Sequence, residues 1–282
     1  LLPAYLMPAE ENDFLTVRSI KRQLDGALGA HGAWLLAPYV DLPSTSGLVL
    51  ESVEDIEETA RLAVKYGYQV NTHAIGDRAN RETLDLYQRA LASAQAADQE
   101  LSANADQDLV QDLRWRVEHA QHIDPADVPR FGELGVIAAI QGVHSISDGP
   151  WVPSRLGDAR TKLTSYPWRD LIDSGAVVAN GTDVPVEGID PIASYYASVS
   201  RMTNSGEKFY PEQAMTRVEA LASYTINNAF AAFEEAHKGS LTPGKLADIV
   251  VLSQNILSVD EEQIPNTLVD MTIVAGQVRY QR

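Results

Sequence analysis

The chain has 282 residues, of which 45% are hydrophobic and 22% charged, and its formal net charge is −17. This charge argues against nucleic acid as a partner, because binding phosphates requires a basic surface. The sequence has no cysteine, so any metal must be held by histidine, by a carboxylate or by a modified lysine. No run of ~18 apolar residues occurs, which predicts no membrane partner.

Five short runs of apolar residues along the chain predict β-strands. Most of these runs are continuously apolar rather than alternating, which is typical of parallel strands covered on both faces. The expected strands cover residues 14–21, 68–74, 113–120, 136–142 and 176–183.

Helices are predicted between and after these strands from amphipathic periodicity and capping residues. Ser52 is expected as one N-cap, Asp124 as another with Pro125 at the first helical position, and Thr216 with Glu219 as a capping box. Residues 97–112 are polar and low in complexity, which favours a surface segment. The expected helices cover residues 52–67, 78–96, 124–135, 166–175 and 215–233.

This alternation predicts an α/β fold. Because a closed parallel barrel needs eight strands, five strands indicate either an open doubly wound sheet or part of a barrel. The tail beyond residue 236 differs, since it contains short β-runs separated by glycine turns. We expect it to form a small β-unit beside the α/β part.

Four of the six histidines lie at or just beyond the end of an expected strand, and Asp183 closes another. In parallel α/β folds the carboxyl ends of the strands carry the functional site. One such histidine alone is more often structural, but their repeated placement indicates a shared cleft. Imidazoles and carboxylates are ligands for zinc, manganese or iron, so the pattern fits hydrolysis by metal-activated water.

Five motifs carry a resemblance to a known family. In chain order they are IKRQLDGALG, VNTHAIGDRAN, RVEHAQHI, NGTDVPVEGIDP and GSLTPGKLADIVVL. Together they resemble the amidohydrolase superfamily, in the branch that contains N-substituted formamide deformylase and metal-dependent hydrolases, some labelled exoenzyme regulatory proteins. The resemblance implies a (β/α)8 TIM-type barrel of which this chain supplies about strands four to eight. It also implies a partial barrel domain at 1–236 and a β-sandwich segment at 237–282.

The resemblance also implies roles for individual residues. His73 and His119 would be metal ligands, and Asp183 would both bind metal and shuttle the catalytic proton. Lys21 would match a lysine that the family carboxylates to bridge two metals, although a plain strand lysine is as good an interpretation. One or two divalent ions, expected to be zinc, would be the cofactor.

Further residues near these ligands are assigned more loosely. His144 is expected in the substrate pocket, and Asp77 with Arg78 is expected to bind substrate from a loop, a local salt bridge being the alternative. His122 is expected to be structural, and Glu118 is expected to lie in the core or to pair with a neighbouring strand. His31 and His237 are expected on the surface.

The family's His-x-His pair does not occur in this sequence, and neither do the first three strands. We therefore expect the C-terminal half to two-thirds of a hydrolase for small amide-like substrates, with little activity by itself. Open barrel edges favour a homo-oligomer, and we expect a cytoplasmic location. A non-catalytic regulatory protein on the same scaffold, and a flavodoxin-like binding protein without metal, are the competing hypotheses.

Overall fold

The computed structural model describes residues 2–7, 15–102 and 112–282. Its centre is a parallel sheet in the strand order β1-β2-β3-β4-β5, so neighbours in sequence are neighbours in space. This confirms the predicted parallel α/β fold. The strands are β1 (Ser19–Gln23), β2 (Gln69–Ala74), β3 (Arg116–His119), β4 (Ile137–Gln141) and β5 (Val178–Gly181).

The two faces of this sheet differ in chemistry because side chains alternate along each strand. One face carries Val70, Val117 and Ala138, all fully buried in the hydrophobic core. The other face carries polar side chains at matched positions, for example Lys21 beside Asn71 and His73 beside Glu118. Polar side chains therefore line this face of the sheet up to the carboxyl ends of the strands.

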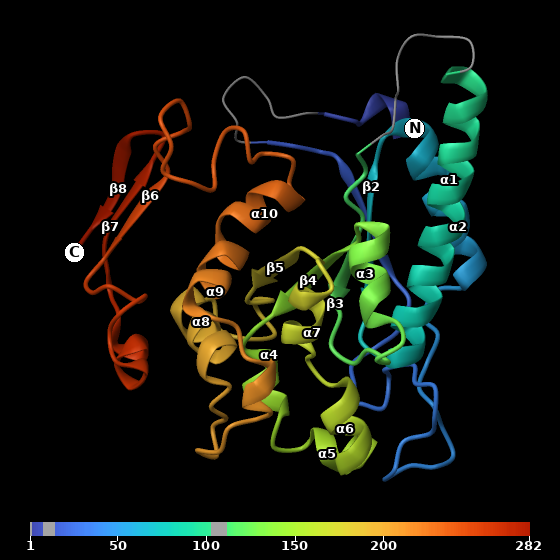
Figure 1. The fold of residues 1–282 in the computed structure, drawn as a ribbon, viewed down its shortest axis with the longest axis horizontal. Helices are drawn as coiled ribbons and strands as arrows, with labels where there is room; N and C mark the ends of the chain where they lie inside the picture. Colours follow the sequence, from blue (N-terminus) through green and yellow to red (C-terminus); the bar gives the residue numbers. More distant parts are fainter. Residues whose placement is uncertain (1, 8–14, 103–111) are drawn as a thin grey trace.

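Helices cover the apolar face and connect the strands (Figure 1). Among the helix pairs, α1 and α2 pack against each other most extensively, and they precede and follow β2 in the chain. The helices that follow later strands are shorter. The first eight are α1 (Val53–Tyr66), α2 (Asp77–Ser102), α3 (Val128–Leu134), α4 (His144–Asp148), α5 (Val152–Leu156), α6 (Asp158–Thr164), α7 (Trp168–Asp173) and α8 (Pro191–Ser200).

Two helix predictions are confirmed at their caps. Ser52 Oγ accepts the N–H of Asp55 at 3.1 Å and begins α1. Thr216 and Glu219 form the expected capping box. The single helix expected over 215–233 is wrong, because Thr225 (φ −122°, ψ −92°) divides it into α9 (Arg217–Tyr224) and α10 (Ile226–Ala231).

Other expected boundaries also need correction. The helix expected to begin after Asp124 begins at Val128, because Asp124 Oδ1 instead accepts the N–H of Ala126 in a turn. Asp77 and Arg78 do not lie in a loop but open α2. That helix was predicted to end at residue 96 but extends to Ser102, into the segment predicted to lie on the surface, while 103–111 lies outside the described residues.

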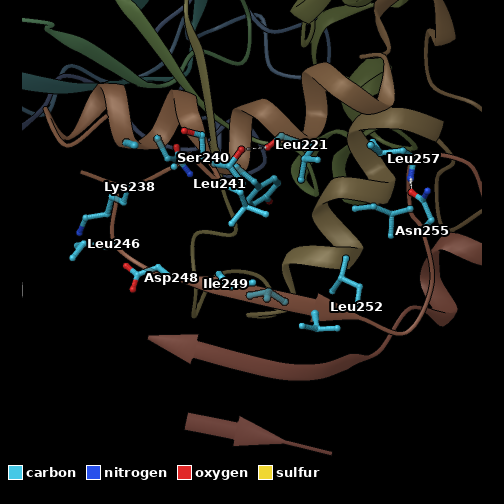
Figure 2. Close-up of a pocket in the computed structure, with 18 of the residues that line it drawn as sticks. Leu221, Lys238, Ser240, Leu241, Leu246, Asp248, Ile249, Leu252, Asn255 and Leu257 are labelled. Atoms are coloured by element: carbon cyan, nitrogen blue, oxygen red, sulfur yellow. Dashed lines mark hydrogen bonds between the residues drawn. The ribbon is translucent and has the colours of Figure 1, made fainter. Parts of the chain in front are cut away.

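The tail forms a separate antiparallel sheet, as predicted, of β6 (Ile249–Leu252), β7 (Val269–Val274) and β8 (Gln277–Gln281). This sheet lies at the opposite side of the molecule from α1 and α2 (Figure 1). A cavity of about 970 Å³ separates β6 from α9 and α10, lined mainly by aliphatic side chains such as Leu221, Leu241 and Ile249 (Figure 2). None of the helices within the described ranges combines the length and hydropathy needed to cross a membrane.

Candidate metal centre

Side chains from the ends of β2 and β3, and from the segments that follow β4 and β5, meet at the carboxyl end of the parallel sheet. His119, His144 and Asp183 each offer a ligand atom, and these three atoms lie within 4.8 Å of one another. The ring of His73 stands 4.3 Å from that of His119, measured between centroids. The structure thus brings His119 and Asp183 together, adds His144 as a further donor, and places His73 against His119.

The backbone turns sharply where two of these residues sit. His119 has φ 77° and Asp183 has φ 57°, in the left-handed region that costs a non-glycine residue roughly 1 kcal/mol or more. β3 therefore ends at His119, not at Ala120 as expected from the apolar run. The turns take both side chains out of the strand alternation at the sheet edge, where the other candidates lie.

Gln141, the last residue of β4, orients His119. Its Oε1 lies 2.8 Å from His119 Nδ1, and an amide oxygen can only accept a hydrogen bond. The Nδ1 atom must therefore carry the proton, which leaves Nε2 with the lone pair. Sequence reasoning missed Gln141, although a polar residue closing the apolar run VIAAIQ was the available signal.

A second residue that sequence reasoning missed lies behind His73. Asp25 has no exposed surface, and its Oδ1 lies 3.5 Å from His73 Nε2. Its carboxylate accepts three backbone N–H groups, from Trp34, Ile75 and Gly76. Burial raises the pKa of Asp25 to about 7, against the opposing effect of these hydrogen bonds.

The two neighbouring imidazoles are neutral near pH 7. Burial, reinforced by His119 and Lys21, lowers the pKa of His73 to about 3. Burial and Lys21 lower the pKa of His119 to about 4. Neutral imidazole is the form that binds metal, so no proton has to be removed before a cation enters.

His144 stands between two carboxylates. Its Nε2 is 3.3 Å from Asp183 Oδ2, and its Nδ1 is 3.6 Å from Glu187 Oε1. Ser147 Oγ donates to the same Glu187 oxygen at 2.7 Å. His144 therefore contacts the predicted proton-shuttling residue directly, and Glu187 joins the site without having been predicted.

Lys21 lies inside β1, where it pairs with Asn71, rather than at the end of a strand. Lys21 is exposed, yet desolvation of its amine by the surrounding protein lowers its pKa. Arg116 lowers that pKa further, while Glu118 and Asp183 act in the opposite direction. Glu118 itself pairs with Arg116 of its own strand at 2.7 Å.

Asp77 and Arg78 make contacts that hold the protein's own chain. Asp77 is buried and accepts the N–H of Leu36 at 2.7 Å. The Arg78 guanidinium lies 4.8 Å from the Trp34 ring centroid, over its face, and 3.5 Å from Glu82. Their substrate-binding role stays a prediction.

The other histidines lie apart from this cluster. His122 is fully buried, and its Nδ1 lies 3.0 Å from Ser165 Oγ, which fits its expected structural role. His237 is exposed, as expected. His31 is only half-buried and pairs with Asp41 at 3.1 Å.

The sequence matches the amidohydrolase family over residues 3–280. The chain belongs to this family. It is 37% identical over 270 residues to LONG AFTER FAR-RED 3 of Arabidopsis thaliana, covering 95% of this chain and 44% of that protein. It is 27% identical over 231 residues to N-substituted formamide deformylase of Arthrobacter pascens, covering 82% of this chain and 40% of the relative.

Solved structures agree with this assignment. An uncharacterized metal-dependent hydrolase of Pyrococcus horikoshii superposes with a TM-score of 0.74 at 31% identity, covering 88% of this chain and 46% of that one. The chain thus spans less than half the length of each of these three relatives.

Proposed function

We propose that this chain carries part of the active site of a metal-dependent hydrolase that cleaves a carbon–nitrogen bond in a small amide-like substrate. The observation that carries the proposal is the meeting of His119, His144 and Asp183 at one edge of the sheet, with the ring of His73 beside that of His119. Amides, formamides and cyclic amides are the substrate classes, and the name of the deformylase relative favours formamides.

The same proposal gives the sheet and the tail a place in a larger architecture. The five parallel strands would be about strands four to eight of a (β/α)8 barrel, within a domain at 1–236. Residues 237–282 would belong to a β-sandwich segment. The Pyrococcus structure, in which this chain covers 46%, supports such a larger assembly.

The donor set fits a divalent metal, and zinc is the ion we propose. His73, His119 and Asp183 would hold it, because neutral imidazole and carboxylate are ligands that zinc accepts. The ligand atoms of His119, His144 and Asp183 lie within 4.8 Å of one another, a spacing that suits a single cation. Lys21, once carboxylated, would supply a bridging ligand for a second ion. A bound cation would polarise the substrate carbonyl and acidify a water molecule.

The residues of this chain would manage the proton. Asp183 would accept a proton from the attacking water and return it to the leaving nitrogen. His144 Nε2, at 3.3 Å from Asp183 Oδ2, would orient that carboxylate. With 34% of its side chain exposed, Asp183 can reach water, as this role requires.

Calorimetric titration of Zn²⁺ into the protein tests the metal site. We expect saturable binding that His119→Asn and Asp183→Asn each weaken at least tenfold, while the exposed control His237→Asn leaves it unchanged. Binding that survives both substitutions would refute the site. Substituting His144→Asn decides whether this residue is a ligand, in which case affinity falls, or contacts substrate only.

Activity is tested in the longest gene product that contains these residues, against formamides, amides and cyclic amides. We expect turnover that Asp183→Asn abolishes, and little turnover from residues 1–282 alone. A product that binds Zn²⁺ but hydrolyses no member of the panel would favour the non-catalytic regulatory alternative.

A further inference from the structure

Asp25 is the most completely buried carboxylate near the candidate metal centre, and no role in the proposed chemistry accounts for it. Its side chain has no exposed surface. Oδ2 accepts the N–H groups of Trp34 and Gly76, both at 2.8 Å, and Oδ1 accepts the N–H of Ile75 at 2.9 Å. Asp25 therefore fixes the turn that immediately follows His73 in the chain.

The same carboxylate faces an unpartnered imidazole nitrogen. His73 Nε2 is buried, has no hydrogen-bond partner among the described residues, and lies 3.5 Å from Asp25 Oδ1. The neighbouring backbone is also tied to this loop, because Leu24 donates its N–H to the carbonyl oxygen of His73 at 3.1 Å. The Asp25 carboxyl group is therefore a candidate acceptor for a proton on this nitrogen.

We infer that Asp25 is a positioning residue that accepts the Nε2–H of His73 and so reserves Nδ1 for the metal. The inference rests on the proposed function, because it presumes that His73 is a ligand. A neutral imidazole carries one proton, so a carboxylate at Nε2 selects the tautomer whose lone pair is on Nδ1. A carboxylate behind a ligand histidine also fixes the ring orientation and raises its basicity.

The arrangement differs from that of the neighbouring ligand. His119 is oriented through Nδ1 by the neutral amide of Gln141, which leaves Nε2 for the metal. The two adjacent imidazoles would therefore present opposite ring nitrogens, one backed by a carboxyl group and the other by an amide. In its ionised form, Asp25 makes His73 the stronger donor of the two.

The first experiment needs no substitution at Asp25. The ring nitrogens of the metal-free protein, labelled with ¹⁵N-histidine, are observed by long-range ¹H–¹⁵N correlation, with His73 assigned from the spectrum of His73→Ala. We expect the proton of His73 on Nε2. A proton on Nδ1, or a rapidly exchanging mixture of the two tautomers, would overturn the inference.

The second experiment is a double-mutant cycle read as Zn²⁺ affinity. We expect Asp25→Asn to weaken binding at least tenfold when His73 is present. In the His73→Ala background the same substitution should change affinity less than twofold. An equal loss in both backgrounds would show that Asp25 acts only by holding the loops.

Asp77→Asn is the matched control, since Asp77 is also buried and anchors the same segment through the N–H of Leu36. We expect it to lower stability without altering the His73 tautomer. Failure of this inference is distinguishable from failure of the proposed function. If His73→Ala leaves Zn²⁺ affinity unchanged, the ligand assignment is wrong; if it lowers affinity but shows no coupling to Asp25, only the inference is wrong.

Discussion

The two sides of the candidate site differ in burial. The side around His73 is buried and held by hydrogen bonds to the backbone, whereas the side around Asp183 is half-exposed. Around His73, the Asp25 carboxylate accepts backbone N–H groups of the β2–α2 turn, and the Trp34 carbonyl accepts those of Arg78 and Ala79 at the start of α2. After Asp183, by contrast, Val186 and Ile189 are 71% and 74% exposed. A ligand gains from being held before the metal arrives, while a carboxylate that exchanges protons with water gains from access to solvent.

The comparison is tested first by Gly76→Ala, for which we expect the largest effect, a loss of stability. A Cβ at Gly76 would lie 2.0 Å from the Trp34 carbonyl oxygen, which is far inside contact distance. We expect Gly76→Ala to lower the free energy of unfolding by about 3 kcal/mol or more, measured by urea denaturation.

The matched change on the other side is Gly188→Ala, where nothing lies within 4 Å of the added Cβ. We expect a change below about 0.5 kcal/mol. Similar losses from the two substitutions would show that the two sides do not differ in rigidity.

The pH dependence of stability tests whether the His73 side is buried, with His122 as the titrating group. His122 belongs to this side because its backbone N–H donates to the carbonyl oxygen of Ile75. Burial lowers the pKa of His122 to about 3. The unfolded chain therefore takes up a proton at His122 near pH ~6.5 that the folded chain does not bind. His122 thus contributes a fall in stability of about 1.4 kcal/mol per pH unit below that pH, until its folded pKa is reached.

His122→Gln removes this proton uptake. Its free energy of unfolding should be lower than that of the unsubstituted chain at pH 7.5, since the contact with Ser165 is lost. Between pH 6.5 and pH 5 it should lose about 2 kcal/mol less. His237→Gln, at an exposed position, should follow the unsubstituted chain, and a parallel curve for His122→Gln would mean that His122 is not buried in solution.

The strands that were predicted well are those whose own residue types favour a strand, without help from contacts with distant segments. The runs at 136–142 and 176–183 contain β4 and β5, because continuous β-branched and aliphatic residues favour a strand buried on both faces, and the run at 68–74 contains β2. The position of His73, His119 and His144 at or after strand ends predicted that they share one edge of the sheet, since the carboxyl ends of parallel strands lie at the same edge.

What the sequence could not supply depends on contacts between distant segments. Neither His119 nor Ala120 is a glycine, the residue that most easily adopts a positive φ, so the local sequence does not predict their positive φ angles. Asp25 reads as an ordinary loop aspartate, and only the approach of Trp34 and the β2–α2 turn buries it. The partner of His119 is likewise on another strand, 22 residues away.

A smaller effect is expected from Asp183→Asn. Because its side chain is 34% exposed and its close partner His144 is an imidazole, we expect the free energy of unfolding to change by less than about 0.5 kcal/mol. Zn²⁺ affinity should nevertheless fall about tenfold. A loss of stability comparable to that from Gly76→Ala would mean that Asp183 holds the fold, contrary to the comparison.

The smallest effect concerns Gln141, whose neutral amide orients His119 between the two sides. Gln141→Leu keeps the approximate size but removes the acceptor at 2.8 Å from His119 Nδ1. The proton should then distribute over both ring nitrogens, visible in the ¹⁵N spectrum, and Zn²⁺ affinity should fall by several-fold, up to about tenfold. Gln141→Glu restores an acceptor and should restore both the single tautomer and the affinity. If Gln141→Leu leaves the tautomer unchanged, the neighbouring rings and not the amide select it, and the orientation of His119 depends on packing alone.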